Sequence, residues 1–278
     1  MLARKIWSFF EKFVTENDHW LPPDNYQEQP VERIAHRTSP TNIGLSLLSN
    51  LSAWDFGYIT TLQFIERTSN TINTLQRMER FRGHFYNWYD TLSLAPLYPK
   101  YISSVDSGNL AGHLIVLKQG LISIPENKII HPGFFQGLSD TLRVLLEYTH
   151  EKEALQQFLQ ELEEKETDKI NSLGEIITYL DQIEVSFARL QIGLNPDVHN
   201  LENLWAQKVL QQLSEQKNTI HALVSWTLIS GVPQRFEPLL SDLSPIPSLK
   251  QIASFEQLYL EKLSGLNGEH LNESEKEW

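Results

Sequence analysis

The sequence predicts an all-α fold made of helical hairpins, of the incomplete α/α-toroid type, with one short β-hairpin. Apolar residues recur at helical spacing through most of the chain, and capping residues stand where several of these segments begin. One aromatic-rich stretch, broken by Pro96 and Pro99, departs from this pattern and indicates strands. Helical hairpins in series build an α/α toroid, and the predicted helices are too few to close a full ring.

Composition places the chain among ordinary globular proteins and excludes several functions. It has 278 residues, 41% hydrophobic and 21% charged, which is enough for one large domain or two small ones. The formal net charge of −12, without a basic cluster, argues against a nucleic acid partner. Cysteine is absent, which excludes disulfides, thiolate catalysis and cysteine-bound zinc. No apolar run approaches the ~18 residues of a membrane span, so the separate chain is expected in the cytoplasm.

The N-terminal part is predicted to hold helices on either side of an irregular loop. Residues 17–40 contain several prolines and polar side chains, which forbid a regular helix. Ser39 and Pro40 suit the cap and first position of a helix that reaches about residue 53, and a second helix covers residues 58–78. Each of these helices is expected to have an apolar face. The face is Ile6, Phe9, Phe10 and Phe13 in the helix before the loop, Leu45, Leu48 and Leu51 in the helix that begins at Pro40, and Leu62, Ile65, Ile72 and Leu75 in the helix over 58–78.

The strands and the helix after them are predicted within residues 83–119. Phe85–Tyr89 is expected to form a short strand that pairs with Tyr101–Val105. Asp106 or Ser107 then caps a helix.

The chain divides into two parts by composition. Residues 1–135 hold the distinctive motifs, and residues 136–278 are a helical continuation with a polar tail. The dense charge of residues 150–169 is typical of a solvated helix face. Helices in the second part are expected at 136–165, 168–192, 200–216, 218–230 and 248–264.

Two groups of polar residues near the N-terminus are candidates for ligand binding. The loop WLPPDNYQ is stiffened by two prolines and predicts either a rim for a polar ligand or an ordered linker whose Trp20 plugs the core. The segment AHRTSPTNIG predicts either an arginine that binds a carboxylate or a sugar hydroxyl, or a helix cap with a structural ion pair. The residues concerned are Trp20, Asp24, Asn25 and Gln27, and His36, Arg37, Thr38, Ser39 and Asn42.

A third group lies on the predicted strand and the helix that follows it. Alternation puts an imidazole, two aromatic rings and a carboxylate on one face of the strand, which suits a sugar-binding wall. The alternative is that the aromatic rings belong to the core and the acids are caps. The residues are His84, Tyr86, Trp88 and Asp90, with Asp106 and Asn109 at the start of the helix.

Catalytic residues stay unassigned. Hydrolysis of a glycosidic bond takes two carboxyl groups, and Asp24, Asp90 and Asp106 lie near the aromatic segments without an evident acid–base partner. The histidines are scattered and no HExxH spacing occurs, so neither a metal nor a cofactor is predicted. A serine hydrolase is not supported either, because no GxSxG is present.

Four long motifs carry a resemblance to a known family. WLPPDNYQE, AHRTSPTNIGL, ERFRGHFYNWYDT and YISSVDSGNLAGHL, in this order and at these spacings, resemble cyclic β-1,2-glucan synthases. These are very large bacterial inner-membrane enzymes, and the likeness is to the start of their middle, glycoamylase-like region. It is dense over about residues 5–122 and thin afterwards.

The resemblance implies an α/α-toroid region that acts on β-1,2-linked glucan, on the cytoplasmic side of the inner membrane. In the family this region is associated with closing the linear glucan into a ring by transglycosylation. The matched residues are then expected near the glucan-binding cleft: Trp20, Asp24, Asn25, Arg37, His84, Tyr86, Trp88, Asp90, Asp106 and Asn109.

The chain also departs from the family. It is several-fold shorter and lacks the membrane transferase, the phosphorylase-like region and the later motifs in which catalytic glutamates are expected. We therefore expect part of a glucan-synthesising or cyclising enzyme whose catalytic residues lie outside this chain. The remaining portion of a split synthase is then an expected partner beside the glucan. The alternative is a non-catalytic glucan-binding or scaffold module.

Overall fold

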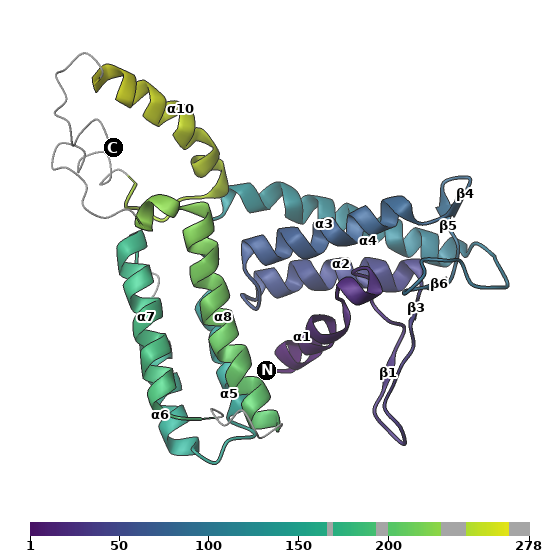
Figure 1. The fold of residues 1–278 in the computed structure, drawn as a ribbon, viewed down its shortest axis with the longest axis horizontal. Helices are drawn as coiled ribbons and strands as arrows, with labels where there is room; N and C mark the ends of the chain where they lie inside the picture. The colour runs from purple at the N-terminus through teal and green to yellow at the C-terminus, as the bar shows by residue number, and fades with distance from the viewer. Residues whose placement is uncertain (166–168, 193–199, 229–242, 267–278) are drawn as a thin grey trace. The chain divides into compact units, whose positions relative to one another are not determined.

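The computed structural model describes residues 1–165, 169–192, 200–228 and 243–266 (Figure 1). It divides into two compact units, Met1–Ile122 and Ser123–Trp278, which are described separately. The described residues are mainly helical and their strands are only two residues long, which confirms the predicted all-α class. The toroid arrangement and the division at residue 135 stay predictions.

The N-terminal unit contains four α-helices and three pairs of short strands. Local chemistry explains where the two helices of its hairpin begin. Ser39 Oγ accepts the Asn42 N–H ahead of Pro40, and Thr60 and Gln63 form a reciprocal capping box. The elements are α1 (Leu2–Phe13), β1 (Tyr26–Gln27), β2 (Arg33–Ile34), β3 (Arg37–Thr38), α2 (Pro40–Asp55), α3 (Thr61–Arg77), β4 (Arg80–Phe81), β5 (His84–Phe85), β6 (Tyr89–Asp90) and α4 (Ser104–Ser123).

The strand pairing differs from the single predicted hairpin. β4 and β5 form a tight hairpin through Arg82 and Gly83, whose φ angles of 51° and 87° are those that such a turn requires. β6 pairs instead with the distant β3, and β1 pairs with β2. The predicted partner segment at residue 101 contributes one backbone bond, from Asn87 N–H to Tyr101 O at 2.9 Å. Ser103 Oγ accepts the Asp106 N–H, so α4 begins earlier than expected.

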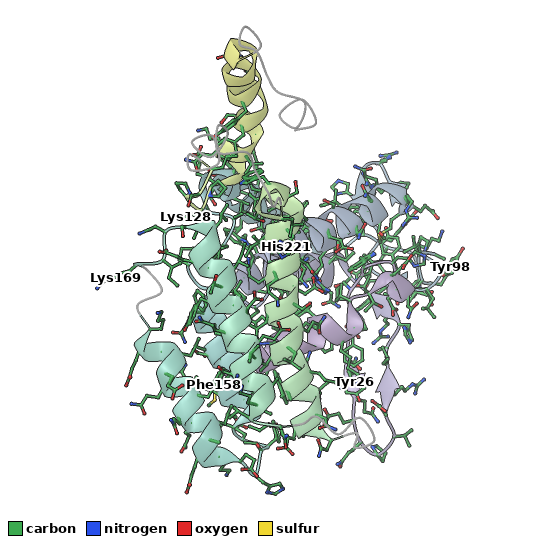
Figure 2. The ribbon with its side chains drawn as sticks, turned by 60° about the vertical axis from the view of Figure 1, so that its left-hand side comes forward. Tyr26, Tyr98, Lys128, Phe158, Lys169 and His221 are labelled. Atoms are coloured by element: carbon green, nitrogen blue, oxygen red, sulfur yellow. The ribbon has the colours of Figure 1, made fainter. Side chains whose placement is uncertain are left out.

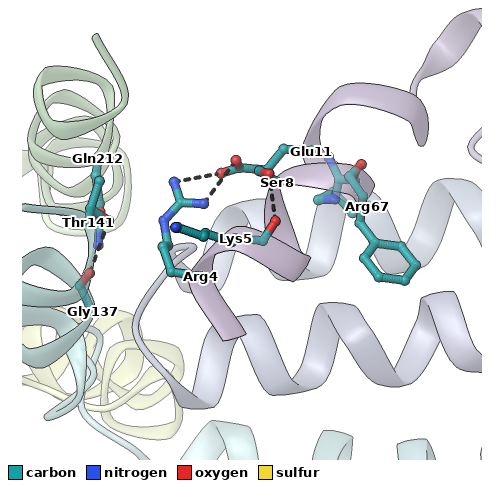
Figure 3. A network of polar contacts seen from close by, with 9 residues as sticks. Arg4, Lys5, Ser8, Glu11, Arg67, Gly137, Thr141 and Gln212 are labelled. Atoms are coloured by element: carbon teal, nitrogen blue, oxygen red, sulfur yellow. Dashed lines mark hydrogen bonds and ion pairs between the residues drawn. The ribbon is translucent and has the colours of Figure 1, made fainter. Parts of the chain in front are cut away.

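Two arginines, the buried Arg4 and the half-buried Arg67, lie beside the aromatic residues of α1 in this unit (Figure 3). Arg4 pairs with Glu11 along one side of α1 at 3.0 Å. Arg67, on α3, donates to the carbonyl of Phe10 (2.8 Å), which also accepts the Val14 N–H, and to the carbonyl of Val14 (3.1 Å), just beyond the end of α1. Helix α1 buries Arg4, Trp7 and Phe13, whereas the predicted face residue Ile6 is 55% exposed.

The apolar faces of the hairpin also differ from the expected ones. Helix α2 buries Ile43 and Leu47, while Leu45 is exposed. Helix α3 buries Phe64 and Leu75, while Ile65 is exposed. Apolar residues occur around most of α2, so its periodicity alone does not select the face that packs.

The C-terminal unit is a helical bundle with its own apolar core. Phe158, labelled in Figure 2, lies in this core with its ring centre 5.9 Å from that of Phe187. Thr141 donates to Gln212 at 2.8 Å and ties α5 to α8 (Figure 3). The helices are η2 (Ile124–Glu126), α5 (Phe134–Leu145), α6 (Lys152–Glu164), α7 (Leu173–Arg189), α8 (Leu201–Leu223), η4 (Ser225–Leu228) and α10 (Leu249–Leu266).

Two helix boundaries in this unit correct the prediction. The helix expected over 136–165 is broken, and Thr149 Oγ1 accepts the Glu151 N–H where α6 begins. The helices expected at 200–216 and 218–230 join as α8, which no glycine or proline interrupts. The charged residues of α6 form the solvent side of a helix that buries Leu155 and Leu162, as predicted. The polar tail lies outside the described residues.

Candidate functional site

A hydrogen-bonded network joins several of the predicted site residues in the N-terminal unit. It forms where the loop after α1, the β3–β6 pair and the first turns of α2 and α4 meet. Leu21, Pro22 and Pro23 are buried and anchor the loop. The loop then continues the β1–β2 ladder, because Asp24 N–H donates to Ala35 O at 3.2 Å.

The first part of the network surrounds the carboxylate of Asp24. Arg37, on β3, donates to Asp24 Oδ2 from Nε (3.1 Å) and Nη2 (2.9 Å). Asn42, in the first turn of α2, donates to Asp24 Oδ1 at 3.2 Å, and the exposed Asn25 donates to Oδ2 at 3.2 Å. The ion pair predicted for Arg37 is therefore present and ties the loop to β3, while the Asn42 hydrogen bond ties the loop to α2.

Trp88 lies beside this ion pair and is partly exposed. The Arg37 guanidinium carbon stands 4.9 Å from the centre of the Trp88 ring, within cation–π range. The side-chain amide of Asn87 has hydrogen-bond partners for both its oxygen and its nitrogen in only one orientation. In that orientation Oδ1 accepts from Trp88 Nε1 (2.8 Å) and from the Tyr101 hydroxyl (2.7 Å). Asn87 Nδ2 then donates to Asp106 Oδ2 at 2.8 Å, and this bond links the aromatic segment Phe85–Tyr89 to α4.

The second part of the network surrounds Asp106. Thr41 Oγ1 donates to Asp106 Oδ1 at 2.6 Å and accepts from Asn109 Nδ2 at 3.1 Å. Burial alone would raise the pKa of Asp106, but hydrogen bonds from Ser103, Thr41 and Ser39 outweigh it and lower that pKa. Asp106 is therefore a carboxylate at neutral pH.

Asp90 has a structural role in the turn after β6. Its Oδ1 accepts the N–H groups of Leu92 and Ser93, at 3.0 and 2.7 Å. Burial raises the pKa of Asp90, and these bonds together with the Ser93 hydroxyl lower it by more. Asp90 faces Arg37 across the β3–β6 pair, so it borders the network while acting as the turn cap.

The remaining predicted residues lie apart from the network. Trp20 packs on Arg67, with the guanidinium 5.6 Å from its ring, as expected for a residue that plugs the core. His84 is exposed on β5. Tyr86 donates its backbone N–H to the hydroxyl of Tyr89 at 2.7 Å, and burial raises the pKa of Tyr89 to about 12.

His36 belongs to a different cluster. Its Nδ1 lies 2.7 Å from Oδ1 of the buried Asp18, which also accepts from Thr91. The backbone N–H of Thr91 donates to His36 O. These contacts tie the loop after α1 to the turn after β6. His36 thus has a structural role, which is one of the two alternatives that the sequence left open for the segment AHRTSPTNIG.

Sequence reasoning missed three residues that link the network. Thr41 follows the helix start Ser39–Pro40, and a side chain in the first turn of a helix is well placed to reach a neighbouring segment. Asn87 was assigned to the other strand face, and Tyr101 to the partner strand. Tyr98 also escaped notice, although it is 85% exposed, with Lys100 Nζ 5.6 Å from its ring (Figure 2).

The arrangement is suited to binding a polyhydroxyl ligand. Trp88 offers part of a ring surface, Arg37, Asn25 and Asn109 offer donors, and the two carboxylates offer acceptors. Asp24 is held in an ion pair and Asp106 is ionised, so neither is prepared to donate a proton to a leaving group. Among the described residues, no three metal-ligating side chains gather at one point.

The hollows of the C-terminal unit contain none of the predicted residues. A shallow one of about 800 Å³ is lined by residues that include Lys169, Gly174 and Tyr179. A smaller one of about 180 Å³ is lined by Ile130, Phe135 and Ile246 among others. The predicted residues thus all belong to the N-terminal unit.

Comparison with known proteins confirms the resemblance found in the motifs. Over 151 residues, 54% of this chain, the sequence is 46% identical to the cyclic β-(1,2)-glucan synthase NdvB of Rhizobium meliloti strain 1021. The match covers 5% of that protein's length. No family model matches the chain.

Two solved structures are distantly similar. They are putative glucoamylases from Bacteroides fragilis NCTC 9343 and Bacteroides caccae ATCC 43185, at 15% and 17% identity and a TM-score of 0.34 each. The likeness covers 58% of this chain and 33% and 34% of theirs. No described helix has the length and apolar character needed to cross a membrane.

Proposed function

We propose that this chain is a glucan-binding part of an enzyme that synthesises or cyclises β-1,2-glucan. The catalytic residues of that enzyme lie outside the chain. The observation that carries the proposal is the network of Asp24, Arg37, Trp88 and Asp106, which joins four motifs that are far apart in the sequence. The 46% identity to a cyclic glucan synthase supports glucan as the ligand.

The proposed binding mode follows from the exposed groups of the network. One glucose unit stacks on the accessible part of the Trp88 ring, and its hydroxyls donate to the two carboxylates. Asn25 and Asn109 are exposed at opposite ends of the network and contact neighbouring units. In the complete enzyme this surface lies on the cytoplasmic side of the inner membrane and holds the growing glucan.

Calorimetry with β-1,2-gluco-oligosaccharides tests the binding. Trp88→Ala should weaken binding at least tenfold, which corresponds to about 1.4 kcal/mol. Asn109→Ala, an exposed change, should weaken it less and leave the fold intact. Phe56→Ala is the matched control, because Phe56 is an exposed aromatic residue just beyond the opposite end of α2. Equal affinity in the wild type and the Trp88 variant would exclude this site.

The non-catalytic alternative, a glucan-binding or scaffold module, is favoured by one observation. Both carboxylates of the network are engaged, and the pKa of Asp106 is lowered, so neither is poised as a general acid. Incubation of the chain with linear β-1,2-glucan, followed by analysis of cyclic and shortened products, tests the claim common to both, that the chain alone is inactive. Products formed by the isolated chain would show that its own residues are catalytic.

A further inference from the structure

The backbone around Trp88 is fixed on both sides, but this alone does not orient its ring. Asn87 N–H donates to Tyr101 O, and Leu97 N–H donates to Trp88 O, each at 2.9 Å. These bonds hold the main chain in place and leave the side-chain torsions of Trp88 free to turn between rotamers. The orientation of the indole therefore depends on the contacts of the side chain itself.

Two contacts of the Trp88 side chain restrict its ring. The Arg37 guanidinium lies over one face, with its carbon 4.9 Å from the ring centre. The indole N–H donates to Asn87 Oδ1 at 2.8 Å. Cation–π attraction is weakly directional within the plane of the ring, whereas a hydrogen bond sets the direction of the N–H. Asn87 thus fixes the rotation that Arg37 leaves open.

The direction of the Asn87 amide is in turn selected by Asp106. Asn87 Nδ2 donates to Asp106 Oδ2 at 2.8 Å. With the amide reversed, its oxygen would face the carboxylate and its nitrogen would face the Trp88 N–H, so that two acceptors and two donors would meet. Asn87 is only 6% exposed, which leaves little access for water to replace the lost partners. The carboxylate of Asp106 therefore decides which atom of the amide meets the indole.

Asp106 is itself held in place by the starts of two helices. Thr41 Oγ1, in the first turn of α2, donates to Asp106 Oδ1 at 2.6 Å. Ser103 Oγ, just ahead of α4, accepts the Asp106 N–H at 3.1 Å. A path of hydrogen bonds thus runs from these helix starts through Asp106 and Asn87 to the indole of Trp88. Such a path orients a binding group before its ligand arrives.

We propose that Asn87 is the positioning residue of the glucan site, and that it holds the Trp88 ring in the orientation set by the Asp106 carboxylate. This inference rests on the proposed function, because the ring is held for a glucose unit, which stacks on the face that Arg37 does not cover. Asn87 acts through Trp88 and does not contact the glucan. Without it, the Trp88 side chain has to be immobilised on binding, which should weaken the affinity about three- to tenfold.

Exchange of the two polar side chains tests the path by calorimetry with β-1,2-gluco-oligosaccharides. Asn87→Asp sets two carboxylates against each other, and Asp106→Asn removes the charge that orients the amide, so each change should weaken binding. The double variant Asn87→Asp/Asp106→Asn restores the pairing with donor and acceptor exchanged. Its new carboxylate at position 87 accepts from the indole, from the Tyr101 hydroxyl and from the new amide at position 106. The double variant should therefore bind within about threefold of the wild type, whereas independent contributions would make the two losses add as free energies.

Hydrogen exchange of the Trp88 indole N–H, followed by NMR, reports on the positioning without any glucan. The proton should exchange with water faster in Asn87→Ala than in the wild type, and slowly again in the double variant. Asn203→Asp is the matched control, because Asn203 is also 6% exposed and lies on α8 in the other unit. This control should change neither the affinity nor the exchange rate.

The outcomes separate this inference from the proposed function. Additive losses in the double variant, or an indole exchange rate that Asn87→Ala leaves unchanged, would overturn the positioning role while glucan binding by the wild type stands. A wild type that binds no oligosaccharide would overturn the proposed function and this inference with it. The double variant keeps the hydrogen bonds of the path, so its affinity decides the question even where a single variant does not fold.

Discussion

Arg67 is predicted to hold α1 against α3, and its replacement tests the structural account of the N-terminal unit. The side chain is half-buried, and this burial lowers the pKa of the guanidinium. It donates to the carbonyls of Phe10 and Val14 at 2.8 and 3.1 Å, and its carbon lies 5.1 Å from the Trp7 ring. Substitution by methionine keeps most of the volume and removes every donor.

The expected loss follows from the groups left unpaired. The Val14 carbonyl loses its partner, which costs about 1–3 kcal/mol, whereas the Phe10 carbonyl still accepts the Val14 N–H. The two lost cation–π contacts cost about 0.5–1 kcal/mol each. Relief of the partly buried charge offsets part of this, so Arg67→Met should lower the free energy of unfolding by about 2 kcal/mol. Arg67→Lys keeps the charge but cannot reproduce the planar fork, so its loss should be intermediate.

Urea denaturation followed by tryptophan fluorescence measures this loss, because Trp7 and Trp20 both contact Arg67. Arg77→Met, a change at the last residue of the same helix, is the matched control and should have a small effect. A loss below about 0.5 kcal/mol for Arg67→Met, within the usual range of surface substitutions, would show that Arg67 does not hold α1 against α3.

Two further substitutions test the packing and the charges around the network. Asp106→Asn should destabilise the protein at neutral pH. Because the folded-state pKa of Asp106 is lowered, its stabilising contribution is present above the unfolded-state pKa and is lost as the pH falls through the folded-state pKa. The difference in urea midpoint between this variant and the wild type should therefore shrink below about pH 4, and a constant difference would contradict the assignment. Gly44→Ala should lower the free energy of unfolding by about 1–3 kcal/mol, because the added methyl group clashes with His113. Gly174→Ala, where the added methyl group meets open space, should leave the stability unchanged or raise it slightly. Equal thermal midpoints for the two variants would contradict the close packing of α2 on α4.

The sequence predicted the helices well where local chemistry decides them. Ser39 with Pro40 marked the start of α2, and the second helix, expected over 58–78, is α3 at Thr61–Arg77. The two-residue strands carry too little local signal, because β3 and β6 are defined by pairing across some fifty residues. The boundary between α5 and α6 was missed for a similar reason, since Thr149 there donates to the distant Glu202.

The candidate site was predicted in part. Asp24, Arg37, Trp88, Asp106 and Asn109 were singled out for their chemistry, and the structure brings them into one network. Thr41 and Asn87, which connect them, could not be distinguished from ordinary polar residues without knowing which segments meet. Trp20 looked equally suited to binding and to packing, and its place beside Arg67 is decided by tertiary contacts.

The most direct test of the central claim is the indole N–H signal of Trp88 in an NMR titration with β-1,2-gluco-oligosaccharides. The chain has seven tryptophans, and single Trp→Phe substitutions assign their signals. If the network binds glucan, the Trp88 signal should shift in a saturable way while that of Trp226, in the other unit, stays in place. A Trp88 signal that does not move at saturating oligosaccharide, or a shift confined to Trp226, would contradict the claim that this network binds glucan.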